Sequence, residues 1–389
     1  MSIETTVTRA WQRQAAWLWL LLPISWLYGL ITMLRRQAYK LGLLSSYRAP
    51  IPVMVIGNIS VGGSGKTPLI IALVNYLQKK NIKVGVISRG YGGDHKQMPA
   101  LVNAHSLPNV VGDEPCLIVS MTHAPMAVSP NREQAITTLL AAHPDLQLII
   151  ADDGLQHYAL QRDIEWIVVD AARGFGNQQL LPTGFLREPM SRLEGANVIY
   201  HEKRETVLAN IDKDSQHQSS RLTMYMQADD MQLLWQPEVS DSQIIDTIPK
   251  NTASNNTVPK KGSQVHAVSG IGYPQRFFDT LGSLGYKVIG HPYPDHYEFT
   301  LVELLQYSDY PIVVTSKDAV KIRALFAQAT TANPLNDEYQ ELVNRLWVLP
   351  VTALLSDDCY QLLEHQIKAL GIEAKERQTM SNTTPASKN

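Results

Sequence analysis

Cysteine is scarce in this sequence, and neither sign of charge dominates it. Cys116 and Cys359 are the two cysteines among 389 residues and form no CxxC pair, so a disulfide scaffold and a CxxC-based zinc site are excluded. A reducing compartment is the simplest environment for such a chain. The 34 basic and 36 acidic residues give a formal net charge of −2. This balance argues against a nucleic-acid-binding protein that relies on bulk positive charge.

Composition and periodicity indicate an α/β protein. Hydrophobic residues make up 44% of the chain and charged residues 18%, which excludes disorder along its whole length, and the length predicts two domains. Short apolar runs alternate with segments of helical spacing in two series, as in βαβ units with mostly parallel sheets. The first series is expected as strands Ile51–Gly57, Lys83–Ser88, Leu146–Asp152, Ile164–Asp170 and Asn197–Tyr200, with helices Thr67–Lys79 and Gln134–Ala142. The second is expected as strands Val265–Gly270, Pro311–Thr315 and Leu346–Val351, with helices Pro274–Leu284, Lys317–Ala327 and Asp358–Leu370.

Polar stretches mark the expected boundaries. Residues 240–262 are rich in Asn, Thr, Ser and Pro, which indicates a linker or a loop insertion. Residues 371–389 are polar and predict a disordered tail. We therefore expect an N-terminal hydrophobic helix (1–48), a larger α/β domain (49–238), a polar linker or insertion (239–263), a smaller α/β domain (264–370) and a tail (371–389).

The first 48 residues combine a long uncharged run with clustered tryptophans. Ala15–Leu34 contains no charge, and a helix of that length would be roughly 30 Å long, about one hydrocarbon core. A cleaved signal peptide is disfavoured, because no small-x-small cleavage site follows the run and two arginines do. A spanning helix, a helix lying in the membrane interface and a buried core helix stay open.

A helix lying in the interface is favoured among these. Pro23 would kink or break a straight span, and one face of the following helix would carry Ser25, Gly29, Thr32 and Arg36. Four of the seven tryptophans lie within residues 11–26, and tryptophan prefers the depth of the interface. Basic residues after the run predict that the rest of the chain is cytoplasmic: Arg35, Arg36, Lys40 and Arg48.

The strongest local motif is GNISVGGSGKTP at residues 57–68, where a strand ends, a glycine-rich turn follows and Lys-Thr begins a helix. It departs from the phosphate-loop pattern GxxxxGK[ST] at Ser60, the first glycine position, but is favoured over a purely structural turn. Backbone amides from Gly62 to Thr67 would converge on phosphate oxygens. Lys66 would neutralise β/γ-phosphate charge, and the Thr67 hydroxyl would bind Mg²⁺. The predicted nucleotide site comprises Ser60, Val61, Gly62, Gly63, Ser64, Gly65, Lys66 and Thr67.

Acidic residues follow two further apolar segments. Asp152 and Asp153, in ADDGLQH, end a hydrophobic strand where phosphate-loop enzymes hold Mg²⁺; the alternative is a pair of turn acids. Asp113, in VGDEP, is either the N-cap of a helix or a general base for a substrate hydroxyl. His157 fits a structural role as well as a substrate contact. His296, from the sequence alone, is a loop histidine that could tune a nearby carboxylate.

Two more loops carry arginine. Arg89, in SRGYGG, follows a strand directly, a position that suits phosphate recognition. Arg187 and Glu188 are adjacent in GFLREP and form either part of a site or a surface ion pair. A guanine-specific NKxD motif is missing, because TSKD at Thr315–Asp318 has the wrong spacing, so a GTPase is disfavoured.

These motifs together resemble one family, the tetraacyldisaccharide 4′-kinases, the lipid A 4′-kinases of Gram-negative bacteria. The matching stretches run in order between residues 57 and 321: GNISVGGSGKTP, SRGYGG, VGDEP, ADDGLQH, GFLREP, SGIGYPQRFFDTL, YPDHYEF and TSKDAVK. The resemblance implies a P-loop NTPase-like domain with a mostly parallel sheet, a second smaller α/β domain and an N-terminal membrane-associated helix. It also implies transfer of the ATP γ-phosphoryl group to the 4′-hydroxyl of a tetraacyldisaccharide 1-phosphate, which gives lipid IVA.

The resemblance implies roles for single residues. It makes Lys66 and Thr67 the phosphate-loop pair, Asp152 and Asp153 the acids near Mg²⁺, Asp113 the base with His296 as its partner, and Arg89, Arg187 and Glu188 family positions. Together with His157, these three are the candidate substrate contacts. It implies a location on the cytoplasmic face of the inner membrane, either on its surface or with a single span, with the lipid substrate and the membrane surface as partners and no nucleic acid. The alternative is a membrane-recruited P-loop ATPase without lipid kinase activity. Val61 counts against it, because those ATPases carry a lysine at that position.

Overall fold

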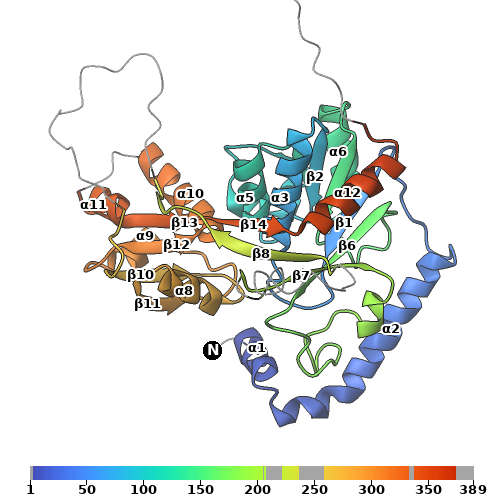
Figure 1. Cartoon of the computed structure of the whole chain (residues 1–389), viewed down its shortest axis with the longest axis horizontal. Coiled ribbons are helices and arrows are strands. Elements are labelled where there is room, and N and C mark those ends of the chain that lie inside the picture. Colours follow the sequence, from blue (N-terminus) through green and yellow to red (C-terminus); the bar gives the residue numbers. More distant parts are fainter. Residues whose placement is uncertain (1–2, 205, 207–220, 236–257, 333–336, 374–389) are drawn as a thin grey trace, which may run out of the picture.

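The computed structural model describes residues 3–204, 206, 221–235, 258–332 and 337–373, which fold into two sheets with helices packed around them (Figure 1). The larger sheet contains β1 (Val53–Gly57), β2 (Val84–Ser88), β3 (Ala100–Val102), β4 (Met126–Val128), β5 (Leu148–Asp152), β6 (Ile164–Asp170), β7 (Asn197–His201), β8 (Thr223–Ala228) and β14 (Val351–Leu355). The smaller sheet contains β9 (Gln232–Leu233), β10 (Gln264–Ser269), β11 (Lys287–Pro292), β12 (Ile312–Thr315) and β13 (Leu346–Leu349).

Helices cover both sheets. Those beside the larger sheet are α3 (Lys66–Lys79), α4 (Pro108–Val111), α5 (Asp113–Thr122), α6 (Arg132–Ala142) and α12 (Asp357–Ala369), with 3₁₀ helices η2 (His95–Gln97) and η3 (Met190–Leu193). Those of the smaller sheet are α8 (Pro274–Ser283), α9 (Leu301–Leu305), α10 (Ser316–Ala332) and α11 (Asp337–Arg345). The N-terminal segment forms α1 (Ile3–Gln12), η1 (Ala16–Leu21) and α2 (Leu22–Lys40).

The larger sheet has the order β14-β8-β7-β6-β1-β5-β2-β4-β3, and its central neighbours are parallel. Its inner strands β1, β2 and β5 are buried at every position, because helices cover both faces, and they therefore consist of apolar runs without alternation. The predicted α/β class is confirmed, and every expected element of the first series lies within two residues of its expected bounds. In parallel sheets of this kind, ligands bind outside the carboxyl ends of the strands.

Two antiparallel chain segments join the sheets. The strand pair β8–β14 in the larger sheet, with Ala228 opposite Val351, leads directly to the pair β9–β13 in the smaller sheet. Figure 1 shows these segments crossing the middle of the molecule side by side. The smaller sheet is thus inserted into the larger domain between β8 and β14.

This crossing corrects two expected boundaries. Leu346–Val351, expected as one strand, is divided between the two sheets at Pro350, because proline has no amide N–H with which to continue a ladder. The following strand and α12 return to the larger domain, so residues 351–369 do not belong to the expected unit 264–370. Conversely, Gln232 and Leu233, expected in the unit 49–238, pair with the smaller sheet. Residues 239–257 of the expected linker and 374–389 of the expected tail lie outside the described residues.

The N-terminal helix α2 turns its polar face toward the protein. The helix begins at Leu22 with Pro23 in its first turn, where proline is tolerated, so the proline precedes the regular helix and does not kink it. Ser25 is 2% exposed, and its hydroxyl donates to Oγ1 of Thr183 at 2.8 Å. The Tyr28 hydroxyl donates to the carbonyl oxygen of Arg187 at 3.1 Å. Of the face predicted to be polar, Ser25 and Gly29 thus lie against the domain, since a Cβ on Gly29 would be 2.8 Å from Leu180.

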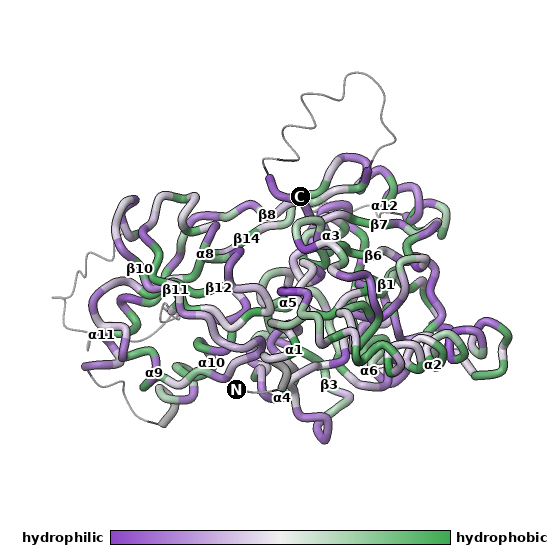
Figure 2. The backbone as a smooth tube through the Cα atoms, turned by 90° about the horizontal axis from the view of Figure 1, so that it is seen from below, coloured by the Kyte–Doolittle hydropathy of each residue, from purple (hydrophilic) through white to green (hydrophobic). Residues whose placement is uncertain are grey.

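The apolar face of the same helix is exposed. Trp26 is 67% exposed, and the neighbouring exposed side chains are Ile24, Leu27, Leu30, Ile31, Met33 and Leu34. Figure 2 shows hydrophobic stretches along α2 at the edge of the molecule. Within the described part of the chain, Ala16–Lys40 is the one helical stretch that is long and apolar enough to cross a membrane, judged by length and composition alone.

Candidate active site

The loop between β1 and α3 has the geometry of an anion-binding turn. Gly65 is the N-cap of α3 with φ +94°, a left-handed conformation that glycine adopts without strain. Among the described residues, none accepts a hydrogen bond from the backbone amides of Gly62–Gly65. These N–H groups lie at the N-terminus of α3, where the helix dipole favours negative charge.

The first two residues of the predicted nucleotide site are engaged elsewhere. The amide of Val61 donates to the carbonyl oxygen of Phe185 at 2.8 Å, and Ser60 forms an antiparallel bridge with Leu186. The backbone groups that remain open to a phosphate therefore run from Gly62 to Thr67.

Lys66 and Arg187 neutralise Asp153. The Lys66 ammonium lies 3.3 Å from Asp153 Oδ1 and donates to Asn58 Oδ1 at 3.2 Å. Arg187 Nη1 contacts both carboxylate oxygens of Asp153, at 3.0 and 3.3 Å. Burial by itself would raise the pKa of Asp153, but Lys66 and Arg187 outweigh burial and lower the pKa to about 2. Asp153 is therefore a carboxylate already paired with two cations.

Asp152, the adjacent residue, is in the opposite situation. It is 1% exposed, and its Oδ2 accepts a hydrogen bond from the Ser88 hydroxyl at 3.0 Å, while Oδ1 is buried without a partner. Burial, followed by the charges of Glu114 and Asp153, raises the pKa of Asp152 to about 7. An orphaned buried carboxylate oxygen is an unusual cost that a cation would remove. Asp152 thus fits Mg²⁺ better than Asp153 does.

Asp113 and His296 meet across the two domains. Asp113 is the first residue of α5 and is 5% exposed, and its Oδ2 lies 3.0 Å from Nδ1 of His296. The N-cap of α5 is Gly112, so the alternative role of Asp113 as an N-cap is not what the structure contains. Gly112 has φ +97°, and a Cβ there would lie 2.6 Å from the carbonyl oxygen of Tyr91, so the tight approach of these loops requires glycine.

The contact shifts the pKa values of Asp113 and His296 in opposite directions. Although burial would raise the pKa of Asp113, its hydrogen bond with His296 and the charge of Lys317 lower it. Burial would lower the pKa of His296, but the hydrogen bond with Asp113 raises it. The pair therefore favours an anionic Asp113 beside an imidazole N–H.

The four predicted substrate contacts have different surroundings. Arg89 is exposed. His157 is half-buried, and burial together with nearby arginines lowers its pKa to about 4, so its imidazole is neutral. Arg187 is paired with Asp153, as described above. Glu188 is 3% exposed and accepts hydrogen bonds from Gln156 Nε2 at 2.7 Å and from the Tyr158 hydroxyl at 2.8 Å, which supports the surrounding loops.

The smaller domain reaches the phosphate loop from the other side. A Cβ built on Gly272, in the loop after β10, would lie 3.4 Å from the amide nitrogen of Gly63. Arg276 of α8 donates to Asp170 Oδ2 at 2.5 Å, and its Nη1 lies 3.2 Å from Nδ1 of His201. The same His201 nitrogen lies 3.2 Å from the carbonyl oxygen of Ser64.

Sequence reasoning missed several residues at this junction. Arg132 is buried in the first turn of α6 and donates to the carbonyl oxygen of Asp152 at 3.2 Å. Its signal was an arginine four residues after the short strand β4, which is not predicted from the sequence. Lys317 lies at the start of an expected helix and within TSKDAVK, but neither pattern predicts a role for it in the site. Its ammonium lies 3.3 Å from His296 Nε2.

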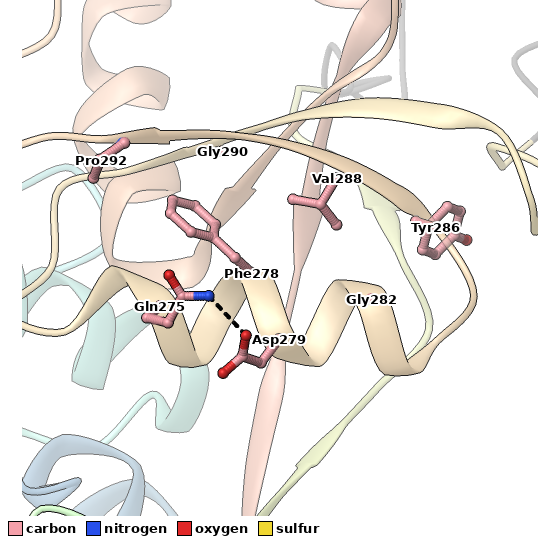
Figure 3. Close-up of a pocket in the computed structure, with 8 residues that line it drawn as sticks. All are labelled: Gln275, Phe278, Asp279, Gly282, Tyr286, Val288, Gly290 and Pro292. Atoms are coloured by element: carbon pink, nitrogen blue, oxygen red, sulfur yellow. Dashed lines mark hydrogen bonds between the residues drawn. The ribbon is translucent and has the colours of Figure 1, made fainter.

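A separate groove of about 650 Å³ lies between α8 and β11 (Figure 3). Phe278, Tyr286 and Val288 line it, and Gln275 donates to Asp279 at its rim at 2.8 Å. None of its lining residues belongs to the site described above.

Comparisons with known proteins agree with one family. A model of the tetraacyldisaccharide-1-P 4′-kinase family matches residues 17–368. A protein named tetraacyldisaccharide 4′-kinase from Psychrobacter cryohalolentis is 69% identical over 380 residues, which cover 97% of this chain and 100% of that protein. Another of that name, from Actinobacillus pleuropneumoniae serotype 5b, is 41% identical over 366 residues, which cover 93% and 99%. The fold is similar to a crystal structure of LpxK from Aquifex aeolicus in complex with ATP, with TM-score 0.61 and 24% identity over 90% of this chain and 98% of that one.

Proposed function

The chain belongs to the tetraacyldisaccharide-1-phosphate 4′-kinase family, and from that premise we propose that it transfers the γ-phosphoryl group of ATP to the 4′-hydroxyl of a tetraacyldisaccharide 1-phosphate. The product is lipid IVA, an intermediate of lipid A biosynthesis. One observation supports the assignment of the site: the open amides of the phosphate loop and the Asp113–His296 pair both lie at the junction of the domains, where a Cβ on Gly272 would approach both Gly63 and Asp295.

The phosphate loop and its neighbours bind the nucleotide. Amides from Gly62 to Thr67 donate to the phosphate oxygens, and Lys66 moves from Asp153 toward the β- and γ-phosphates when these bring their own negative charge. Thr67 and Asp152 would hold Mg²⁺, with Asp153 nearby. Bound Mg²⁺ would supply neutralisation of the charge on the transferring phosphoryl group.

Asp113 accepts the acceptor proton in this proposal. Its carboxylate takes the proton of the 4′-hydroxyl as that oxygen forms a bond to the γ-phosphorus and the bond to the β,γ-bridging oxygen breaks, releasing ADP. The Nδ1–H group of His296 would donate a hydrogen bond to the Asp113 carboxylate and orient it, without giving up its proton. Arg89 and His157 remain candidates for contacts with the lipid headgroup.

A lipid acceptor requires the enzyme to work at a membrane. The exposed apolar face of α2 supports binding in the interfacial layer, because the opposite face is held against the domain by Ser25 and Tyr28. Arg35, Arg36 and Lys40 follow the apolar stretch, which suits an anionic membrane surface. ATP is cytoplasmic, so we propose the cytoplasmic face of the inner membrane as the location.

The test is a lipid phosphorylation assay with γ-labelled ATP and the disaccharide in mixed micelles, read by thin-layer chromatography. We expect label to appear in the lipid product and to depend on Mg²⁺. ATP hydrolysis that proceeds at the same rate without the disaccharide, with no labelled lipid, would favour the membrane-recruited ATPase instead. Removal of residues 1–36 should reduce pelleting with vesicles more than it reduces ATP binding, and undiminished pelleting would contradict the proposed role of α2.

A further inference from the structure

Lys317 lies behind the Asp113–His296 pair, at the second residue of α10, and its side chain is 15% exposed. Its ammonium nitrogen is 3.1 Å from Asp295 Oδ1, 3.2 Å from Glu114 Oε1 and 3.3 Å from His296 Nε2. A lysine ammonium has three N–H donors and no acceptor, so these three contacts account for all of its hydrogen bonds.

The contact with His296 fixes where the imidazole proton lies. Because an ammonium can only donate, the ring nitrogen that faces it, Nε2, must present its lone pair. The single proton of a neutral imidazole is then on Nδ1, the nitrogen that lies 3.0 Å from Asp113 Oδ2. One lysine contact thus selects the tautomer that donates to Asp113.

The charges around His296 explain why a cation is needed there. Asp113 and Glu114 approach from α5, and Asp295 Oδ1 lies 3.8 Å from Nε2 within the same loop as the histidine. The Tyr91 ring packs against the imidazole with the ring centroids 4.9 Å apart. Burial lowers the pKa of His296, whereas Asp113 and Asp295 raise it, and the charge of Lys317 opposes their effect. Lys321, further along α10, acts on Asp113.

We propose that Lys317 is a positioning residue that holds His296 in the Nδ1–H tautomer and opposes its protonation, so that Asp113 remains an available base. The inference rests on the proposed function of Asp113. Lys317 contacts neither nucleotide nor acceptor in this assignment; it acts through His296. Since it belongs to the smaller domain and Asp113 to the larger, the base is completed only where the two domains meet.

The first experiment compares pH–rate profiles of wild type, Lys317→Met and Lys317→Arg over about pH 6 to 9. Loss of the cation should raise the apparent pKa of the acid limb by about one unit or more, as expected for a charge within 4–6 Å. The rate of Lys317→Met should therefore fall several-fold at pH 7 and recover at higher pH, and Lys317→Arg should restore most of the profile. Lys83→Met, which removes an exposed ion pair with Asp145, is the matched control and should leave the profile unchanged.

Two outcomes separate this inference from the function on which it rests. If Asp113→Asn retains the wild-type rate, the proposed base is wrong. If Asp113→Asn is inactive but Lys317→Met loses rate equally at every pH, then Lys317 is merely structural and the inference is overturned.

A second measurement reads the tautomer in the wild-type protein and needs a variant only to assign the signals. In the wild-type protein at about pH 8, ¹⁵N NMR of the imidazoles reports the tautomer, with the His296 signals assigned by comparison with His296→Gln. We expect a protonated Nδ1 and an unprotonated Nε2. A protonated Nε2 would overturn the proposal.

Discussion

The two groups of acidic residues beside the phosphate loop are assembled differently. Asp152 ends β5 of the larger sheet and Asp153 directly follows it, and every partner described for them lies in the larger domain. Asp113 begins a helix of the larger domain, whereas His296 and Lys317 come from the smaller one. The first group, which we call the metal-side group, is complete within one domain. The second, which we call the base-side group, needs both.

This difference indicates a division of labour. We expect nucleotide and metal binding to depend on the metal-side group alone, since β5 and the phosphate loop fix its geometry. We expect proton transfer to depend on contact between the domains, because His296 and Lys317 reach Asp113 only across the junction. The predictions below test that division.

The largest effect is expected for Lys66→Ala. It removes the cation nearest the proposed phosphates. An arginine that stabilises the same transition-state charge in nucleotide-hydrolysing enzymes is worth on the order of 10³–10⁵-fold in rate, and we expect a loss of similar order here. The measurement is kcat at saturating ATP, with circular dichroism to verify folding. Lys83→Ala, on the surface, is the control and should retain full activity. Near wild-type turnover of Lys66→Ala would contradict the assignment of the phosphate loop.

A Mg²⁺ titration of Asp113→Asn and Asp152→Asn compares the two groups directly. Loss of the base should lower kcat by about 10²–10⁴-fold without changing the Mg²⁺ concentration for half-maximal rate. Asp152→Asn should instead raise that concentration, because it alters the orphaned carboxylate. Asp153→Asn should have a smaller effect on the Mg²⁺ requirement, since its carboxylate is already paired with Lys66 and Arg187. If only Asp113→Asn changed the Mg²⁺ concentration for half-maximal rate, Asp113 would be the metal ligand and the proposed roles would be reversed.

Stability of the Mg²⁺-free protein should depend on pH through Asp152. Its pKa is raised from 3.8 to about 7, so the native state binds the proton more tightly than the unfolded state between those values. The contribution of protonated Asp152 to the free energy of unfolding is fully present below about pH 4 and is lost as the pH rises through 7. Asp152→Asn, which is neutral at every pH, should therefore gain in melting temperature relative to wild type as the pH is raised. A constant difference between the two proteins from pH 4 to 8 would contradict the shifted pKa.

The smallest effect is expected at the contact of α2. Ser25→Ala leaves the buried hydroxyl and amide of Thr183 without their partner, which should lower the free energy of unfolding by about 1–3 kcal/mol. Urea unfolding is the measurement, and the exposed Ser120→Ala is the control. The Thr183 loop continues to Arg187, which touches Asp153. If the metal-side group is independent of the membrane helix, the Mg²⁺ requirement of Ser25→Ala should stay unchanged.

Sequence reasoning succeeded where one local pattern determines the structure. The phosphate loop was predicted because strand, glycines, Lys66 and helix follow one another within a few residues. Asp152 and Asp153 were predicted because a buried strand ends at them. Nothing local, however, distinguishes the two: only the fold pairs one with Lys66 and Arg187 and leaves an oxygen of the other unpartnered.

The remaining features of the site and fold could not be predicted locally, because they depend on contacts between residues far apart in the sequence. Residues 183 positions apart form the Asp113–His296 contact, and no periodicity reports such a pairing; the expectation came from the family resemblance. The predicted domain boundary was wrong at Pro350. The residues on both sides of this proline are apolar and typical of strands, so the sequence does not reveal that the chain passes from one sheet to the other there. The polar face of α2 was visible in the sequence, but its partner Thr183 was not.

The smaller domain leaves the larger domain and returns to it at a single point of the β8–β14 strand pair. Ala228 and Val351 face each other as partners in the β8–β14 ladder, so residues 229–350 depart and return at one rung. A hairpin turn of about two to five residues spans such a gap. A chain with that turn in place of the insert would keep the ladder, the phosphate loop and the carboxylates of Asp152 and Asp153, and would lack His296 and Lys317. We therefore expect such a chain to keep the nucleotide-binding loop and the proposed base Asp113, and to lose the two residues that position this base.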